Sequence, residues 1–222
     1  MRHVSWMRLL LIIVCALVAS TARAEDQRSS DGALYQRGGQ LGTGLVLGVK
    51  AGAGLGQPFG DLGTSFITEL ELGYNLPFLQ RSFELFLTGA YTQPKAEGTL
   101  DDARLPGPAK YEIKQQQAQL TLGLLYRIPL ANRLFRPYLS VGPRLFAMRS
   151  EAKGSADGLP FGKNEETSTK LGVFAALGGE LMLGPGALLL EVSLSWAKLD
   201  GHIFRDTNAG ALGIALGYRF FL

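Results

Sequence analysis

The sequence predicts an all-β fold, an eight-stranded antiparallel up-and-down transmembrane β-barrel, from two patterns. Eight segments after Gln40 alternate apolar residues with small or polar ones, which is the period of two of a β-strand with two different faces. The last segment, Leu212 to Leu222, keeps its apolar face up to the final residue. A soluble protein would leave such a strand end unprotected, whereas a membrane barrel uses it to close on its first strand.

The N-terminus has the three parts of a signal peptide over residues 1–24. Arg2 and Arg8 supply the charged region, an apolar core runs from Leu9 to Ala19, and Ala22-Arg23-Ala24 is a small-x-small cleavage site. The core is shorter than the roughly 20 residues that a membrane-spanning helix needs, and no later continuous apolar run reaches that length either. We therefore expect a cleaved leader, a flexible periplasmic segment over residues 25–40, and the barrel over residues 41–222.

The excess of basic residues comes from the leader. The chain has 22 Lys and Arg against 19 Asp and Glu, and three of the bases, Arg2, Arg8 and Arg23, precede the cleavage site. The mature chain is therefore neutral, with 19 bases against 19 acids, and a nucleic-acid partner is excluded. Cys15, the single cysteine, also lies in the leader, so the mature chain has neither a disulfide nor thiol chemistry.

In the first four strands, large apolar residues alternate with small and polar ones. The fourth is the clearest, because its apolar belt covers nine residues, close to the roughly 9–11 that a tilted membrane strand needs. Beyond Ala118 both faces of this strand become polar, as if it continued into water. The residues expected to point outward are Leu45, Leu47 and Val49; Phe66, Leu70, Leu72 and Tyr74; Phe83, Leu85, Leu87 and Tyr91; and Ala118, Leu120, Leu122, Leu124 and Tyr126.

The last four strands have the same two faces. Pro143 interrupts the fifth, where it cannot donate a ladder hydrogen bond, and the pattern favours a β-bulge there. The eighth is the C-terminal strand, Leu212 to Leu222. The residues expected to point outward in the other three are Leu139, Val141 and Leu145; Leu171, Val173, Leu177, Leu181 and Leu183; and Leu188, Leu190, Val192, Leu194 and Trp196.

Long and short connections alternate along the chain, as they do in outer-membrane barrels with long outer loops and short periplasmic turns. Outward aromatic residues fall near both strand ends and predict an interfacial girdle at each. The long connections are Gln57–Thr64, Pro94–Ala109, Glu151–Glu166 and Gly201–Thr207, and the short ones are Pro77–Ser82, Pro129–Leu134 and Gly184–Gly186.

The less apolar face of the strands is dense in glycine and alanine, for example Gly48, Gly172 and Gly217. Small residues suit the narrow interior of an eight-stranded barrel, whereas a secreted soluble barrel would show water a face rich in Lys, Glu, Ser and Thr. The chain after Gln40 resembles the small eight-stranded outer-membrane proteins of the OmpA, OmpX and OmpW kind. The resemblance implies the outer membrane of a Gram-negative bacterium. It also implies that the assembly machinery of that membrane recognises Leu212–Leu222, although Leu222 replaces the usual terminal aromatic.

Ten charged residues are expected inside the barrel, where an isolated charge costs several kcal/mol and must be paired. A turn at Pro185-Gly186 would place Glu180 directly opposite Glu191, with Arg219 as the first candidate base between them and Arg144 as the second. Two readings stay open: a salt-bridged plug, or a polar path for protons and small ions. The ten residues are Lys50, Glu69, Glu71, Glu84, Arg127, Arg144, Lys170, Glu180, Glu191 and Arg219.

The sequence offers little support for catalysis. Lipid A deacylases and palmitoyltransferases of this architecture use histidine with serine, but the mature chain has one histidine, His202, which we expect to be an exposed loop residue. The run Arg205 to Gly210 is faintly similar to the deacylase pattern His-x-Ser-Asn, with Arg205 and Thr207 in place of the base and the nucleophile. We therefore expect no catalytic residue, no metal site and no cofactor.

Outward-pointing Lys114, Arg149 and Lys198 lie just beyond the apolar belt, at the height of lipopolysaccharide phosphates. They are either lipid contacts or a solvated rim. The leading hypothesis is a non-enzymatic integral protein whose outer loops contact lipopolysaccharide, neighbouring proteins or surfaces. The alternatives are a narrow channel for small or apolar solutes, which the resemblance to OmpW implies, and a lipid A-modifying enzyme.

Overall fold

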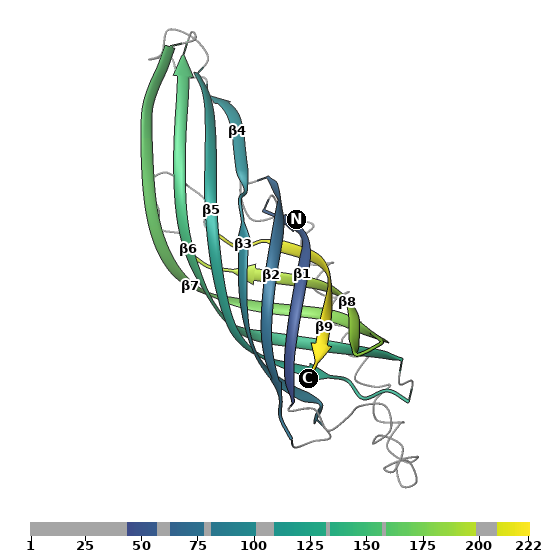
Figure 1. Cartoon of the computed structure of the whole chain (residues 1–222). Coiled ribbons are helices and arrows are strands. Elements are labelled where there is room, and N and C mark those ends of the chain that lie inside the picture. Colours follow the sequence, from purple (N-terminus) through teal and green to yellow (C-terminus); the bar gives the residue numbers. More distant parts are fainter. Residues whose placement is uncertain are drawn as a thin grey trace, which may run out of the picture.

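The computed structural model describes residues 44–56, 63–77, 81–100, 109–131, 134–156, 159–198 and 208–222 (Figure 1). The predicted leader and periplasmic segment lie outside these residues, as does the predicted connection Gly201–Thr207 with His202. Among the residues described, no helix is long and apolar enough to span a membrane. The strands are β1 (Leu45–Leu55), β2 (Thr64–Asn75), β3 (Phe83–Thr92), β4 (Lys95–Leu100), β5 (Ala109–Arg127), β6 (Phe135–Ala156), β7 (Leu159–Leu183), β8 (Gly186–Trp196) and β9 (Leu212–Phe221).

The strands form one closed antiparallel sheet. Apart from β3 and β4, each strand pairs with its neighbour in sequence, and β9 pairs with β1 over Val46–Leu55 to close the ring. β3 and β4 both pair with β5 and follow one another along it, so they fill a single position in the barrel. The nine strands thus occupy eight positions, which confirms the predicted eight-stranded up-and-down barrel.

The two faces of the sheet differ as the alternation predicts. Along β5, Leu120, Leu122 and Leu124 are exposed on the outer face, whereas Gln119 and Thr121, which alternate with them, are buried inside. Apolar side chains that water would expel cover the outer surface, as in a protein whose solvent is lipid. Outward aromatic residues lie toward both ends of the barrel: Tyr74, Phe83, Tyr126 and Phe220 near the short turns, and Phe66, Tyr91 and Trp196 near the opposite end.

Three strands continue far beyond the rest of the barrel (Figure 1). β5, β6 and β7 have 19, 22 and 25 residues, against 10 to 12 in the other full-length strands. The predicted loops Pro94–Ala109 and Glu151–Glu166 were therefore largely wrong, because β4 and the outer parts of β5, β6 and β7 occupy much of them. Cross-strand pairing satisfies the backbone hydrogen bonds of these polar segments. We call residues 95–99, 112–116, 149–155 and 165–170 the outer sheet.

The predicted bulge at Pro143 is wrong. The register between β5 and β6 is the same on both sides of the proline, with Thr121 opposite Arg144 and Leu124 opposite Val141. The ladder omits the pairs in between. The missing N–H of the proline therefore interrupts the pairing locally and does not insert an extra residue. The register shift between β6 and β7 lies instead at Lys153/Gly154, in the outer sheet.

The turn between β7 and β8 is one residue earlier than predicted. Leu183 pairs with Gly186, which leaves Gly184 and Pro185 as the two turn residues. Gly184 has φ +62°, a backbone conformation that glycine adopts without strain and that the first position of a tight hairpin turn requires. Glu191 therefore lies opposite Gly178 and Glu180 lies opposite Leu189, so the direct opposition of the two glutamates was wrong.

Candidate functional site

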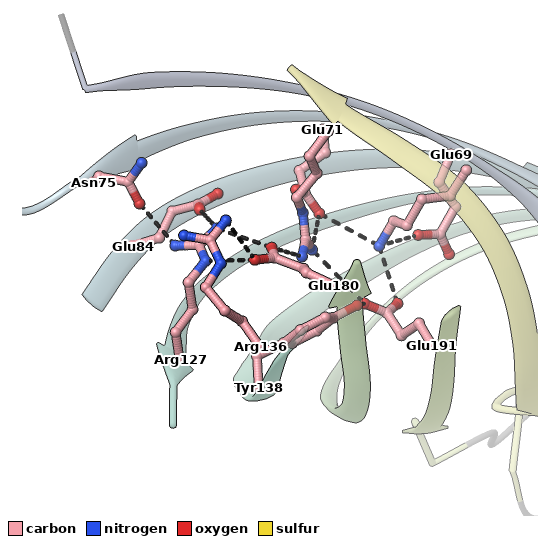
Figure 2. Close-up of polar contacts among 11 residues, drawn as sticks. Glu69, Glu71, Asn75, Glu84, Arg127, Arg136, Tyr138, Glu180 and Glu191 are labelled. Carbon is pink, nitrogen blue, oxygen red and sulfur yellow. Dashed lines mark hydrogen bonds and ion pairs between the residues drawn. The ribbon is translucent and has the colours of Figure 1, made fainter. Parts of the chain in front are cut away.

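The interior of the barrel near the short turns is filled by nine charged side chains, which we call the interior ion-pair cluster (Figure 2). Each of the eight barrel positions contributes at least one member, so the cluster connects the whole circumference. All members except the partly exposed Arg136 are buried. They are Lys50 (β1), Glu69 and Glu71 (β2), Glu84 (β3), Arg127 (β5), Arg136 (β6), Glu180 (β7), Glu191 (β8) and Arg219 (β9).

Arg219 is the centre of the cluster and is 1% exposed. Its Nε and Nη2 donate to the two carboxylate oxygens of Glu71 at 2.5 and 2.9 Å, a bidentate pair that fixes both side chains. Its Nη1 donates to Glu180 Oε1 at 2.8 Å, and Nη2 lies 3.9 Å from Glu191 Oε2. The guanidinium also lies 4.6 Å from the ring centre of Tyr138. Arg219 therefore contacts Glu180 and Glu191, between which the sequence placed it.

Arg127 links β5 to β2, β3 and β7 at the short-turn end of the barrel. Its guanidinium donates to Glu180 at 2.9 and 3.1 Å, to Glu84 at 2.5 Å and to Asn75 Oδ1 at 2.7 Å. The ring of Phe221 lies beneath it, 5.5 Å from the guanidinium carbon. Every guanidinium nitrogen of Arg127 thus has an acceptor, as a buried cation requires.

Lys50 holds the opposite side of the cluster. Its ammonium lies 2.8 Å from Glu69, 3.0 Å from Glu191 and 3.4 Å from Glu71. The hydroxyl of Tyr138 donates to the second oxygen of Glu191 at 2.8 Å. One lysine therefore counters three carboxylates, which explains how several glutamates share the narrow space.

Toward the outer sheet the interior changes from charged to neutral polar groups. Gln119 donates to Gln117 at 2.9 Å, Gln117 donates to Gln115, and Gln115 donates to Ser150 at 3.0 Å. Arg144, the second candidate partner for the glutamate pair, donates to Thr121 at 2.6 Å and to Gln119 instead. It is buried and forms no ion pair with the carboxylates in the described part of the chain.

Lys170 lies apart from the interior ion-pair cluster. Its side chain is half-buried, and it is paired in register with Phe146 at the base of the outer sheet. Nine of the ten predicted interior charges are buried inside the barrel, and eight of these nine belong to the cluster.

The three predicted lipid-contact residues point outward and are exposed. Lys114 lies 2.9 Å from Glu112, and Arg149 lies 2.7 Å from Glu165. The hydrogen bond between Lys114 and Glu112 lowers the pKa of the Glu112 carboxyl and raises the pKa of the Lys114 ammonium, so both groups stay charged at neutral pH. The backbone of Lys198 forms an isolated antiparallel β-bridge with Asn208 at the same end of the barrel.

Four residues that belong to the cluster or contact it were not predicted from the sequence. Arg136 lies 3.3 Å from Glu180, and Tyr138, Asn75 and Phe221 contribute the hydroxyl, amide and ring described above. The signal for two of them was present, because Arg136 and Tyr138 continue the inward phase of Ser140 back toward the preceding turn. The predicted connection before this strand ended at Leu134, but outward and inward residues were assigned only from Leu139 onward.

Comparisons with known proteins found a family model that matches the chain and solved structures to which it is similar. The family model described as "Outer membrane protein beta-barrel domain" matches residues 11–220. Neisserial surface protein A has 16% identity and a TM-score of 0.47, with 80% of this chain and 96% of that chain covered. The N-terminal β-barrel domain of Pseudomonas aeruginosa OprF has 15% identity and a TM-score of 0.45, with 82% and 99% covered.

Ail of Yersinia pestis, solved with the heparin analogue sucrose octasulfate, has 17% identity and a TM-score of 0.38, with 79% of this chain and 96% of that chain covered. No curated protein sequence matches the chain. The family model spans nearly the whole sequence, so this chain belongs to the outer-membrane β-barrel family and is located in the outer membrane.

Proposed function

We propose that this protein is a non-enzymatic outer-membrane barrel with a closed interior that acts through its outer sheet and contacts lipopolysaccharide. In outer-membrane barrels the short turns face the periplasm and the longer connections face outward. The outer sheet therefore rises from the cell surface, and the interior ion-pair cluster lies toward the periplasm.

The observation that carries the closed interior is that the cluster draws on all eight barrel positions. An eight-stranded barrel is just wide enough for side chains to fill. Here the fill is ion-paired, with Arg219 bound to two carboxylates and Lys50 close to three. A solute crossing this level would have to separate buried ion pairs, which is strongly unfavourable.

The lipid contact rests on where the outward bases lie. Ala118 pairs with Ala147 at the edge of the apolar belt, and Arg149 lies opposite Gln116 in the next outward pair. One step further out, Lys114 pairs with Lys95 across the two strands. Like charges directly opposite each other are unfavourable, and an anion between them removes the repulsion. The three bases Arg149, Lys114 and Lys95 therefore suit the phosphates of lipopolysaccharide.

The acidic neighbours of these bases do not prevent such contacts. Both ion pairs are exposed, with the Arg149 side chain 62% and the Lys114 side chain 45% accessible. Exposed pairs contribute only about 0–1 kcal/mol, so a lipid phosphate can replace or join the carboxylate at small cost.

Replacing both Lys114 and Arg149 by glutamine should weaken lipopolysaccharide binding. Each base near a membrane surface contributes about 1 kcal/mol, so the apparent affinity of the refolded protein should fall by roughly 30-fold. Native mass spectrometry with defined lipopolysaccharide at one salt concentration measures this. Arg81→Gln is the matched control, because Arg81 is an exposed arginine at the opposite end of the barrel. Equal affinity of the double variant and the wild type would contradict the contact.

A further inference from the structure

Arg144 differs from the other fully buried cations of the barrel. Lys50, Arg127 and Arg219 each contact at least one carboxylate, whereas Arg144 binds only a hydroxyl and an amide oxygen. Its guanidinium lies over the ring of Phe174, 4.0 Å from the ring centre. The side chain is buried, and its Nη2 has no hydrogen-bond acceptor in the described structure. Such a donor costs about 1–3 kcal/mol if it stays unpaired.

Arg144 lines a small cavity. Its volume is about 20 Å³, and Arg144 and Glu69 line it together with Ser65, Thr92, Gln117 and Gln119. Gly63, Pro94 and Gly210 line its outward side, so it belongs to the half of the barrel that faces the outer sheet. A water molecule needs roughly 10–15 Å³ and two to four polar partners, and this cavity provides both.

A second buried atom on the same cavity also lacks a hydrogen bond. Glu69 Oε2 lies 2.8 Å from the Lys50 ammonium but outside hydrogen-bonding geometry. The lining therefore includes a donor without an acceptor, Arg144 Nη2, and a carboxylate oxygen, Glu69 Oε2, which is ion-paired with Lys50 and can accept a further hydrogen bond. An occupant that satisfies both must accept one hydrogen bond and donate another. A halide can only accept, and it would face the Glu69 carboxylate as a like charge.

We propose that one water molecule occupies this cavity and bridges Arg144 Nη2 to Glu69 Oε2 as a solvent-mediated ion pair. The water gives Arg144 the carboxylate contact that its three fellow cations make directly. It connects β6 to β2 across the barrel and joins the neutral outer half of the interior to the interior ion-pair cluster. This inference rests on the proposed closed interior. It adds a second level at which polar contacts close the lumen, on the outer side of the interior ion-pair cluster.

A crystal structure of the full chain in detergent, grown with bromide in place of chloride, tests the occupant directly. We expect density for one water within hydrogen-bond distance of both atoms, without an anomalous signal. An anomalous bromide peak at the site would replace the water with an anion and overturn the proposal. A dry cavity, or a direct contact between Arg144 and Glu69, would overturn it as well.

A double-mutant cycle tests the link in the lipid-inserted protein. Arg144→Met and Glu69→Gln preserve side-chain size, and their effects on the unfolding equilibrium constant should be coupled by about ten-fold. The cycle of Arg144→Met with Glu84→Gln is the control, because Glu84 does not line the cavity, and it should be additive. Additivity in the Glu69 cycle would overturn the bridge. Neither readout depends on lipid binding or conductance, so the water site and the proposed function can fail separately.

Discussion

Replacing Arg219 by alanine is expected to lower the free energy of unfolding by about 3–5 kcal/mol, which is the usual cost of removing one partner from a buried ion pair. The substitution removes both hydrogen bonds to Glu71 and the one to Glu180. The two carboxylates would then remain inside the barrel with fewer counter-charges. Arg127 still contacts Glu180 and Lys50 still lies near Glu71, so the cluster would be weakened without being abolished.

Urea unfolding of the refolded protein in lipid vesicles measures this change, followed by tryptophan fluorescence or by mobility on unheated gels. Arg149→Ala is the control, because it removes an exposed arginine from an outward ion pair and should cost no more than about 1 kcal/mol. Equal losses for the two variants would show that the cluster does not stabilise the barrel.

Replacing Gly52 by alanine is expected to impair closure between β1 and β9. A Cβ at Gly52 would lie 2.7 Å from the Cα of Ala215 and 2.9 Å from the carbonyl carbon of Ile214. These are backbone atoms of the neighbouring strand, so neither can turn away as a side chain would. Separating them disturbs the ladder that closes the barrel, and we expect a loss of about 3 kcal/mol or more.

Gly89→Ala provides the matched control for this substitution. Gly89 lies in β3, and a Cβ there would meet nothing within 4 Å. The yield of the compact, heat-modifiable form after refolding compares the two variants. We expect Gly89→Ala to refold like the wild type and Gly52→Ala to refold poorly. Equal yields would contradict the close approach of β1 and β9 at this point.

The barrel could be predicted from sequence because one face of nearly every strand meets lipid. That condition imposes the period of two on each strand separately, as in Leu120, Leu122 and Leu124, and no knowledge of the partner strand is needed. The same phase identified the inward charges, since a glutamate such as Glu71 between two outward leucines has no other place to point.

Features that depend on two strands together were harder to predict. The register of β7 with β8 follows from which two residues form the turn, and a one-residue change in the turn moved Glu180 away from Glu191 by two positions. The outer sheet has polar residues on its outward face, such as Lys114 and Arg149, so no apolar alternation marks its strands and they look like loop sequence although they pair. Arg136 was missed for a different reason, because the predicted connection ended at Leu134 but the alternation of that strand was followed only from Leu139 onward.

Single-channel conductance of the refolded mature chain in a planar bilayer tests the closed interior most directly, once heat-modifiable mobility has shown that the protein is folded. We expect no discrete openings, because the interior ion-pair cluster, which draws on all eight barrel positions and is buried except for Arg136, fills the lumen. Reproducible openings from well-folded protein would contradict this account. They would favour a narrow conduit in which Arg219 and the glutamates around it act as the filter.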